Sequence, residues 1–155
     1  MSTTAIQTVP FAEVKENLSR FVSTVARRHA PRILERSHGE ESILALPLSD
    51  LPAALAGCAF DARVTFGESV VATLPQFGLV ASGPDLDSAI DALVDELTDY
   101  CADFFSDFDY YRHTERVRHL PWLLRFGLAE PADRRSLLTG TSGASVDEVA
   151  TAAAR

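Results

Sequence analysis

The sequence has 155 residues, of which 46% are hydrophobic, so it can form one ordinary domain or two small ones and is too apolar to be wholly disordered. No apolar run approaches the length of a membrane span, and the first ten residues lack the features of a signal peptide, so we expect a cytoplasmic protein. The formal net charge of −8 is uneven: residues 1–50 sum to zero, residues 51–110 to −10 and residues 111–155 to +2. This asymmetry suggests two different partners.

The N-terminal third of the sequence predicts a strand, a helix and a hairpin. Residues 5–9 indicate a short edge strand, and residues 11–28 place their apolar side chains at helical spacing. Two short apolar runs, 33–34 and 43–46, flank a turn with Gly39 and predict a β-hairpin.

A short helix is expected after this hairpin. Ser49 or Asp50 is suited to cap it, because their side chains accept hydrogen bonds from unpaired backbone N–H groups.

A second block of elements follows Gly57. Residues 62–75 alternate in polarity and are rich in β-branched side chains, and residues 78–83 supply a third strand. A long helix is expected from Asp85 or Leu86 to about Asp107, followed by shorter helices over 116–130 and 131–138. Together the two blocks predict an α+β fold that ends in a flexible tail, residues 141–155.

The long helix carries an aspartate at every fourth position, which we call the acidic row: Asp87, Asp91, Asp95, Asp99, Asp103 and Asp107. At about 100° per residue, its large apolar side chains share the opposite face: Leu86, Ile90, Leu93, Leu97, Cys101, Phe104 and Phe108. Like charges four residues apart cost a few tenths of a kcal/mol each. The row is either a solvated face or an electrostatic partner for a basic surface.

Residues 8–55 resemble the prevent-host-death, or Phd/YefM, antitoxins of bacterial type II toxin–antitoxin operons. The resemblance rests on the order and spacing of Asn17-Leu18-Ser19, Glu35-Arg36, Gly39, "ILALPLS" and Asp50. It implies a small N-terminal domain of strand, helix, β-hairpin and helix, over residues 1–56. Such a domain forms a homodimer, binds operator DNA and represses its own operon.

The same resemblance implies which side chains contact DNA. Lys15 and Arg36 fall where the family places its DNA-contacting basic residues, and Arg20, Arg32 and His38 are secondary candidates. Basic side chains suit this role because they neutralise phosphates and release counterions. The alternative is that they are ordinary surface charges.

The sequence departs from the family pattern in ways that bear on DNA binding. Pro10 stands where a serine or threonine cap is usual, and Glu35 replaces a common threonine beside Arg36. Glu40 and Glu41 follow the turn. Because carboxylates repel phosphates, these acids weaken the expected contact with DNA.

Residues 63–93 resemble the HicB-type antitoxin fold, a small sheet followed by a helix. This resemblance implies that residues 57–140 form a toxin-binding α+β domain. The expected partner is a small basic ribonuclease toxin of RelE type. Five aspartates of the acidic row, from Asp91 to Asp107, are then the candidates for facing it: Asp91, Asp95, Asp99, Asp103 and Asp107.

Trp122 lies in the apolar segment 120–128 and has two interpretations. It packs on the apolar face of the long helix, or it anchors the toxin, since aromatic side chains dominate interface hot spots.

The competing function classes are an enzyme and an adaptor. The four histidines lack metal-ligand spacing with acids or cysteines, and no nucleophile elbow, phosphate loop or dinucleotide fingerprint is present. Cys101 lies on the apolar face of the long helix, where a core role is expected. We therefore expect an antitoxin without catalytic activity, metal or cofactor. A protein-interaction adaptor that has lost DNA binding is the alternative.

Overall fold

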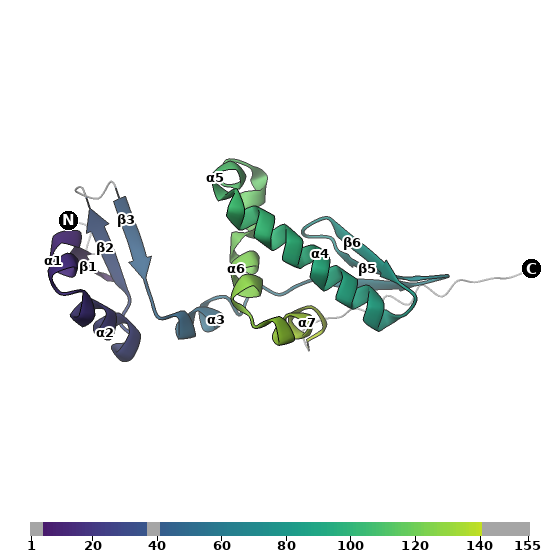
Figure 1. Cartoon of the computed structure of the whole chain (residues 1–155), viewed down its shortest axis with the longest axis horizontal. Helices are drawn as coiled ribbons and strands as arrows, with labels where there is room; N and C mark the ends of the chain where they lie inside the picture. The colour runs from purple at the N-terminus through teal and green to yellow at the C-terminus, as the bar shows by residue number, and fades with distance from the viewer. Residues whose placement is uncertain (1–4, 37–40, 141–155) are drawn as a thin grey trace, which may run out of the picture. The chain divides into compact units, whose positions relative to one another are not determined.

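A computed structural model describes residues 5–36 and 41–140 of the chain (Figure 1). The chain divides into two compact units, residues 1–56 (unit 1) and residues 57–155 (unit 2). Each unit combines helices with a three-stranded sheet, which confirms the expected α+β class. Gly39, His38, Glu40 and the tail 141–155 lie outside the described residues.

The sheet of unit 1 has the order β1-β2-β3. Strand β1 (Gln7–Pro10) pairs in parallel with β2 (Arg32–Arg36), and β2 pairs antiparallel with β3 (Glu41–Ala45). The parallel pair requires a crossover, which the intervening helices supply. The expected edge strand and hairpin are therefore confirmed.

The expected continuous helix over residues 11–28 is wrong. It is interrupted at Asn17, which separates α1 (Phe11–Glu16) from α2 (Leu18–Arg28). Asn17 has φ −131° and ψ 48°, outside the helical region. Asparagine favours such a break because its short polar side chain competes with the helical hydrogen bonds of the backbone. The break turns Leu18 to the surface, although the helical periodicity places it on the buried face.

Helix α2 ends at His29, whose φ of 49° and ψ of 44° lie in the left-handed region used by helix C-caps. The ring Nδ1 of His29 lies 2.9 Å from both carboxylate oxygens of Asp50. Asp50 belongs to the short turn η2 (Leu48–Asp50), which precedes α3 (Leu51–Ala54). Asp50 is the N-cap residue of α3, as expected for Ser49 or Asp50, but its side chain makes no capping hydrogen bond because the carboxylate faces His29 instead.

Unit 2 is built on an antiparallel meander of β4 (Arg63–Phe66), β5 (Val70–Leu74) and β6 (Leu79–Gly83). Helix α4 (Leu86–Ser106) packs across β5 and β6 (Figure 1). Its first turn comes so close to the sheet that a Cβ atom on Gly83 would lie 2.6 Å from the backbone nitrogen of Ala89. Only glycine permits this approach.

Helix α4 follows the expectation from its sequence closely. The Asp85 carboxylate caps it by accepting the Ser88 N–H at 2.8 Å, and this bond holds the pKa of Asp85 below its usual value. The apolar face is buried from Ile90 to Phe104. At its ends, Leu86 is 43% exposed, and Phe108 lies beyond the end of the helix in α5 (Phe108–Tyr111).

The expected C-terminal helices are present as α6 (Leu120–Leu128), preceded by the turn η3 (Glu115–His119), and α7 (Pro131–Thr139). Both contact α4. Leu123 and Phe126 of α6 are fully buried and complete the core that α4 forms with the sheet. Within the described residues, no helix is both long and apolar enough to cross a membrane.

Candidate functional sites

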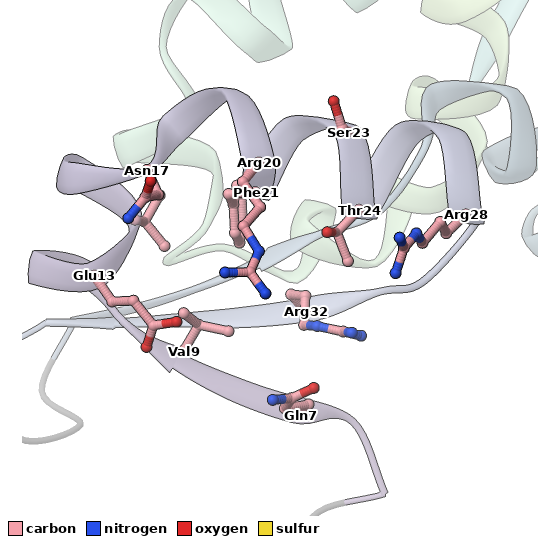
Figure 2. A pocket seen from close by; sticks show the side chains of 11 residues that line it. Gln7, Val9, Glu13, Asn17, Arg20, Phe21, Ser23, Thr24, Arg28 and Arg32 are labelled. Atoms are coloured by element: carbon pink, nitrogen blue, oxygen red, sulfur yellow. The ribbon is translucent and has the colours of Figure 1, made fainter.

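Unit 1 carries a groove of about 340 Å³ between helices α1 and α2 and strands β1 and β2. Arg20 and Arg28 reach into it from α2, and Arg32 reaches into it from β2 (Figure 2). Glu13 is the one acidic side chain that lines it; the other lining groups include Gln7, Asn17, Ser23 and Thr24. We call this feature the arginine groove. Three guanidinium groups against one carboxylate suit it to an anionic partner with several phosphates.

The structure brings together only part of the predicted DNA-binding set. Arg20 and Arg32 line the arginine groove. Lys15 is exposed on the last turn of α1 and does not line it. Arg36 lies at the opposite end of β2 from Arg32, 3.5 Å from the Glu41 carboxylate and 5.6 Å from the centre of the Phe11 ring. His38 lies outside the described residues.

Arg28 is a groove residue that the sequence-based prediction missed. The signal was available, because Arg20, Thr24 and Arg28 recur every four residues and therefore share one face of α2. Glu41, one of the acids near the turn, has its carboxylate beside Arg36 and offsets that charge, and the expected weakening of DNA contact stays a prediction. Arg20, Arg28 and Arg32 are not offset in this way within the described residues.

All six aspartates of the acidic row are exposed. Asp87 and Asp91 both form ion pairs with Arg135 of α7, which lies 44 residues beyond Asp91 in the chain. In the described part of the chain, Asp95, Asp99 and Asp103 have no ion-pair partner. The free negative charge of the row is therefore concentrated on the C-terminal half of α4.

Trp122 is half-buried at the edge of the unit 2 core. Its indole Nε1 donates a hydrogen bond of 2.8 Å to the backbone carbonyl of Ala59. One side of the ring lines a hollow with Gln76, Phe77, Arg118 and His119. Trp122 thus packs against the core and also lines this hollow, and its expected contact with the toxin stays a prediction.

His119 is a buried polar residue, 7% exposed, which the sequence-based prediction did not single out. Its Nδ1 lies 2.7 Å from the hydroxyl of Tyr100, and its ring lies 4.9 Å from that of Phe77. Its Nε2 is buried and makes no well-formed hydrogen bond within the described residues, although the backbone of Gln76 lies close enough to act on the pKa of the ring. Burial lowers the pKa of His119, and the neighbouring charges of Arg118 and Arg116 lower it further. Both effects favour the neutral form of the ring.

No group of three or more histidine, cysteine or acidic side chains in the described ranges could hold a metal ion. Cys101 is buried, and its Sγ contacts the backbone carbonyl of Leu123 at 3.5 Å. Burial raises the pKa of this thiol. These properties suit a core residue and not a nucleophile.

Comparison with known proteins gives one family and one fold. The sequence profile of the PHD-like family, described as "Antitoxin of toxin-antitoxin, RelE / RelB, TA system", matches residues 5–138. A crystal structure from Syntrophomonas wolfei subsp. wolfei, assigned as the antitoxin part of a toxin/antitoxin system, has a similar fold, with a TM-score of 0.75. The two chains are 24% identical, and the similarity covers 84% of this chain and 94% of the other. No curated protein matches the chain.

The finer resemblances, to Phd/YefM antitoxins in the N-terminal third and to HicB-type antitoxins after it, stay predictions. The profile match spans most of the chain and includes both units. An antitoxin is a non-enzymatic regulator with a cognate toxin as its partner, in agreement with the expected absence of catalysis. The chain therefore belongs to the PHD-like family of toxin–antitoxin antitoxins.

Proposed function

We propose that this antitoxin neutralises its toxin by direct binding through unit 2, and represses its own operon by binding operator DNA as a homodimer through unit 1. The separation of charge supports this division. Unit 1 has six basic and six acidic residues and gathers three of its arginines in one groove. Unit 2 has eight arginines against sixteen acidic residues and displays an acidic row on α4.

The homodimer is supported by the small core of unit 1. Among the described residues of this unit, Val14 and Val25 are the buried hydrophobic side chains. Six large apolar side chains are exposed instead: Phe11, Leu18, Val22, Ile43, Leu44 and Leu48. Covering a large apolar side chain stabilises a protein by about 1.5–3 kcal/mol, so a second copy that covers several of them supplies what the monomer lacks.

The oligomeric state of the full-length protein tests this part. Ile43 of β3 is 63% exposed, and Ile43→Asp should convert a dimer into a monomer in sedimentation velocity. Val80 of β6 in unit 2 is 62% exposed and gives a matched control, because Val80→Asp should leave the dimer intact. A wild-type monomer contradicts the proposal, and dissociation by Val80→Asp alone would place the interface in unit 2.

Operator binding is supported by the arginine groove. In a dimer with two-fold symmetry, two copies of Arg20, Arg28 and Arg32 present two cationic surfaces to a palindromic site. Lys15 is exposed and adds a phosphate contact outside the groove. Arg36 contributes less than the family pattern implies, because Glu41 lies beside it.

The test is binding of the full-length protein to the DNA upstream of its gene, over a range of salt concentrations. Arg20→Ala, Arg28→Ala and Arg32→Ala should each weaken binding and lower the salt slope by about one unit. Lys15→Ala should do the same. Arg27→Ala is the matched control, since Arg27 is exposed on α2 but does not line the groove. Equal losses in the control and the groove variants contradict the assignment.

Toxin binding is supported by the part of the acidic row that is free of ion pairs. A ribonuclease toxin must attract RNA phosphates, so its active surface is positive. Asp95, Asp99 and Asp103, with Asp107 at the end of α4, are placed to cover such a surface in place of RNA. Pairing of this kind mainly speeds encounter and is screened by salt, while apolar contacts supply most of the affinity.

Stopped-flow association with an inactive form of the toxin encoded beside this gene tests the acidic row. The triple variant Asp95→Asn, Asp99→Asn, Asp103→Asn should associate more slowly at low salt and match the wild type at high salt. Adding Asp91→Asn and Asp107→Asn should slow association at low salt further. The control is Glu68→Gln, Glu130→Gln, Asp133→Asn, three exposed acids outside α4 that change the net charge equally. Equal rates at low salt in the wild type, both variants of the row and the control would leave the row a solvated surface.

The adaptor that has lost DNA binding is the second candidate, and the Arg36–Glu41 contact favours it. It predicts toxin binding by the wild type without retention of upstream DNA, even at low salt.

A further inference from the structure

Unit 2 carries two adjoining hollows that share the side chains of Gln76, Phe77, Arg118 and His119. The first, which we call the apolar slot, is also lined by Trp122. The second, the cationic groove, adds Arg116 and Tyr110. We propose that these hollows together receive one segment of the toxin, in which an aromatic or long aliphatic side chain enters the slot and a neighbouring carboxylate binds Arg118 and Arg116. This inference rests on the proposed toxin binding by unit 2.

The size and lining of the slot indicate a single side chain as its occupant. The slot has a volume of about 200 Å³, below the roughly 300–1,000 Å³ typical of pockets that hold a whole small molecule. The rings of Phe77, His119 and Trp122 form much of its wall. Aromatic walls of this kind recur where one anchor residue of a partner is desolvated at an interface.

The charge beside the slot indicates a carboxylate on the incoming segment. Unit 2 has twice as many acidic residues as arginines, yet neither Arg116 nor Arg118 forms an ion pair with a carboxylate in the described part of the chain. The Arg116 guanidinium lies 5.9 Å from the centre of the Tyr100 ring. Glu115, which also lines the cationic groove, is the one acid there. Two arginines left without carboxylates in an acidic unit are available to an external one.

The net charge of unit 2 favours a protein segment over a nucleic acid. Aromatic rings beside arginines could also stack nucleobases. However, sixteen acidic residues against eight arginines give unit 2 a net charge of −8, which repels a phosphate backbone. One carboxylate on a short segment avoids most of that repulsion.

The walls of the slot are held in place before a partner arrives. The 2.7 Å contact between Tyr100 and His119 fixes the histidine ring, and the hydrogen bond from Trp122 to Ala59 fixes the indole. His119 is 93% buried, so its ring is held by the surrounding core and presents only part of its surface to the slot. A rigid slot costs little ordering entropy on binding. The slot therefore suits an anchor, whereas the acidic row suits long-range attraction.

Arg118→Glu in the full-length protein tests the carboxylate contact, with calorimetric titration of the inactive toxin. We expect this variant to bind about ten- to a hundredfold more weakly, because a like charge then faces the incoming carboxylate. Arg112→Glu is the matched control, since Arg112 is exposed, pairs with Asp109 and lines neither hollow. Replacing the contacting toxin carboxylate with lysine should restore binding to Arg118→Glu.

Trp122 reports on the slot directly because it is the single tryptophan of the chain. With a toxin whose own tryptophans are replaced by phenylalanine, binding should shield Trp122 from quenching by acrylamide. Unchanged quenching at saturation, or equal toxin affinities for Arg118→Glu and the wild type, overturns the inference while toxin binding itself stands. If Arg118→Glu loses binding to a labelled RNA but keeps the wild-type affinity for the toxin, the inference is overturned and the hollows are an RNA site instead. A wild type that does not bind toxin removes the proposed function as well.

Discussion

The two units contain similar elements, but they differ in what their helices pack against. In unit 2, α4 buries Leu93, Leu97 and Phe104 completely, in a core that also includes side chains of the sheet and of α6. In unit 1, α2 has the same kind of amphipathic pattern, yet Leu18 and Val22 are more than half exposed. The described residues of unit 2 include fifteen buried hydrophobic side chains, and those of unit 1 include two. Unit 2 therefore has a large core of its own, whereas unit 1 has a small one, and the proposed dimer is what would cover its exposed apolar side chains.

The same comparison applies to charge. Unit 1 is neutral as a whole but gathers arginines in one groove, whereas unit 2 is acidic but leaves two arginines beside an apolar slot. In both units the candidate binding residues are arginines: three that gather in one groove of a neutral unit, and two that lie beside an apolar slot in an acidic unit. Such arginines attract negatively charged groups on a partner.

The two units should differ most in the stability that they lose when a large apolar side chain is removed. Phe104→Ala deletes a fully buried ring and should lower the free energy of unfolding of unit 2 by about 3–5 kcal/mol, through lost burial and the cavity left behind. Ile43→Ala should lower the stability of the monomeric unit 1 far less, because Ile43 is 63% exposed. Urea unfolding at low protein concentration measures both. Equal losses contradict the difference between the cores.

The close contact between β6 and α4 predicts the next largest effect. Gly83→Ala places a Cβ atom against the backbone of Ala89 and should cost about 1–3 kcal/mol, as is usual when a packed site is overfilled. Gly57→Ala is the matched control, because no atom lies within 4 Å of its new Cβ. Thermal unfolding should show a loss for the first variant alone. A loss of similar size in the control would mean that the effect does not come from packing against Ala89.

His119 predicts a pH dependence that belongs to unit 2. Its pKa is lowered in the folded state, so below the ordinary value of 6.5 the unfolded chain binds a proton that the folded chain does not. Stability should therefore fall as the pH drops through 6.5 toward the folded-state pKa of His119. His119→Gln removes the titration and should flatten this part of the curve in urea unfolding measured between about pH 5 and pH 8. Identical pH profiles contradict the prediction.

The ion pairs of Arg135 predict the smallest effect. Arg135→Gln breaks the contacts with Asp87 and Asp91, but exposed pairs of this kind contribute about 0–1 kcal/mol. The variant should instead speed toxin association slightly at low salt, because two more aspartates of the acidic row become free. Chemical denaturation and stopped-flow association measure the two effects. A stability loss of several kcal/mol indicates that α7 depends on Arg135 for docking.

The sequence predicts those features that depend on local pattern. The strands of unit 2 and the bounds of α4 follow from alternation, from helical periodicity and from the cap at Asp85. The break at Asn17 does not, because the apolar spacing continues across it and a single unfavourable residue decides the outcome. In the candidate sites, Arg20 and Arg32 are named from the family resemblance, and the structure places both in the arginine groove, while their contact with DNA stays a prediction. The pairing of Asp91 with Arg135, and of Tyr100 with His119, depends on tertiary packing that no local pattern encodes.

The central claim is that each unit serves one partner, and one experiment on the full-length protein tests it most directly. The variants Arg20→Ala/Arg28→Ala/Arg32→Ala and Asp95→Asn/Asp99→Asn/Asp103→Asn are each measured at low salt for upstream-DNA affinity and for the rate of toxin association. The arginine variant should lose DNA binding and keep the wild-type rate of toxin association. The aspartate variant should keep the wild-type DNA affinity and associate with the toxin more slowly. Loss of both activities in either variant, or loss of neither in both, contradicts the division of roles between the two units.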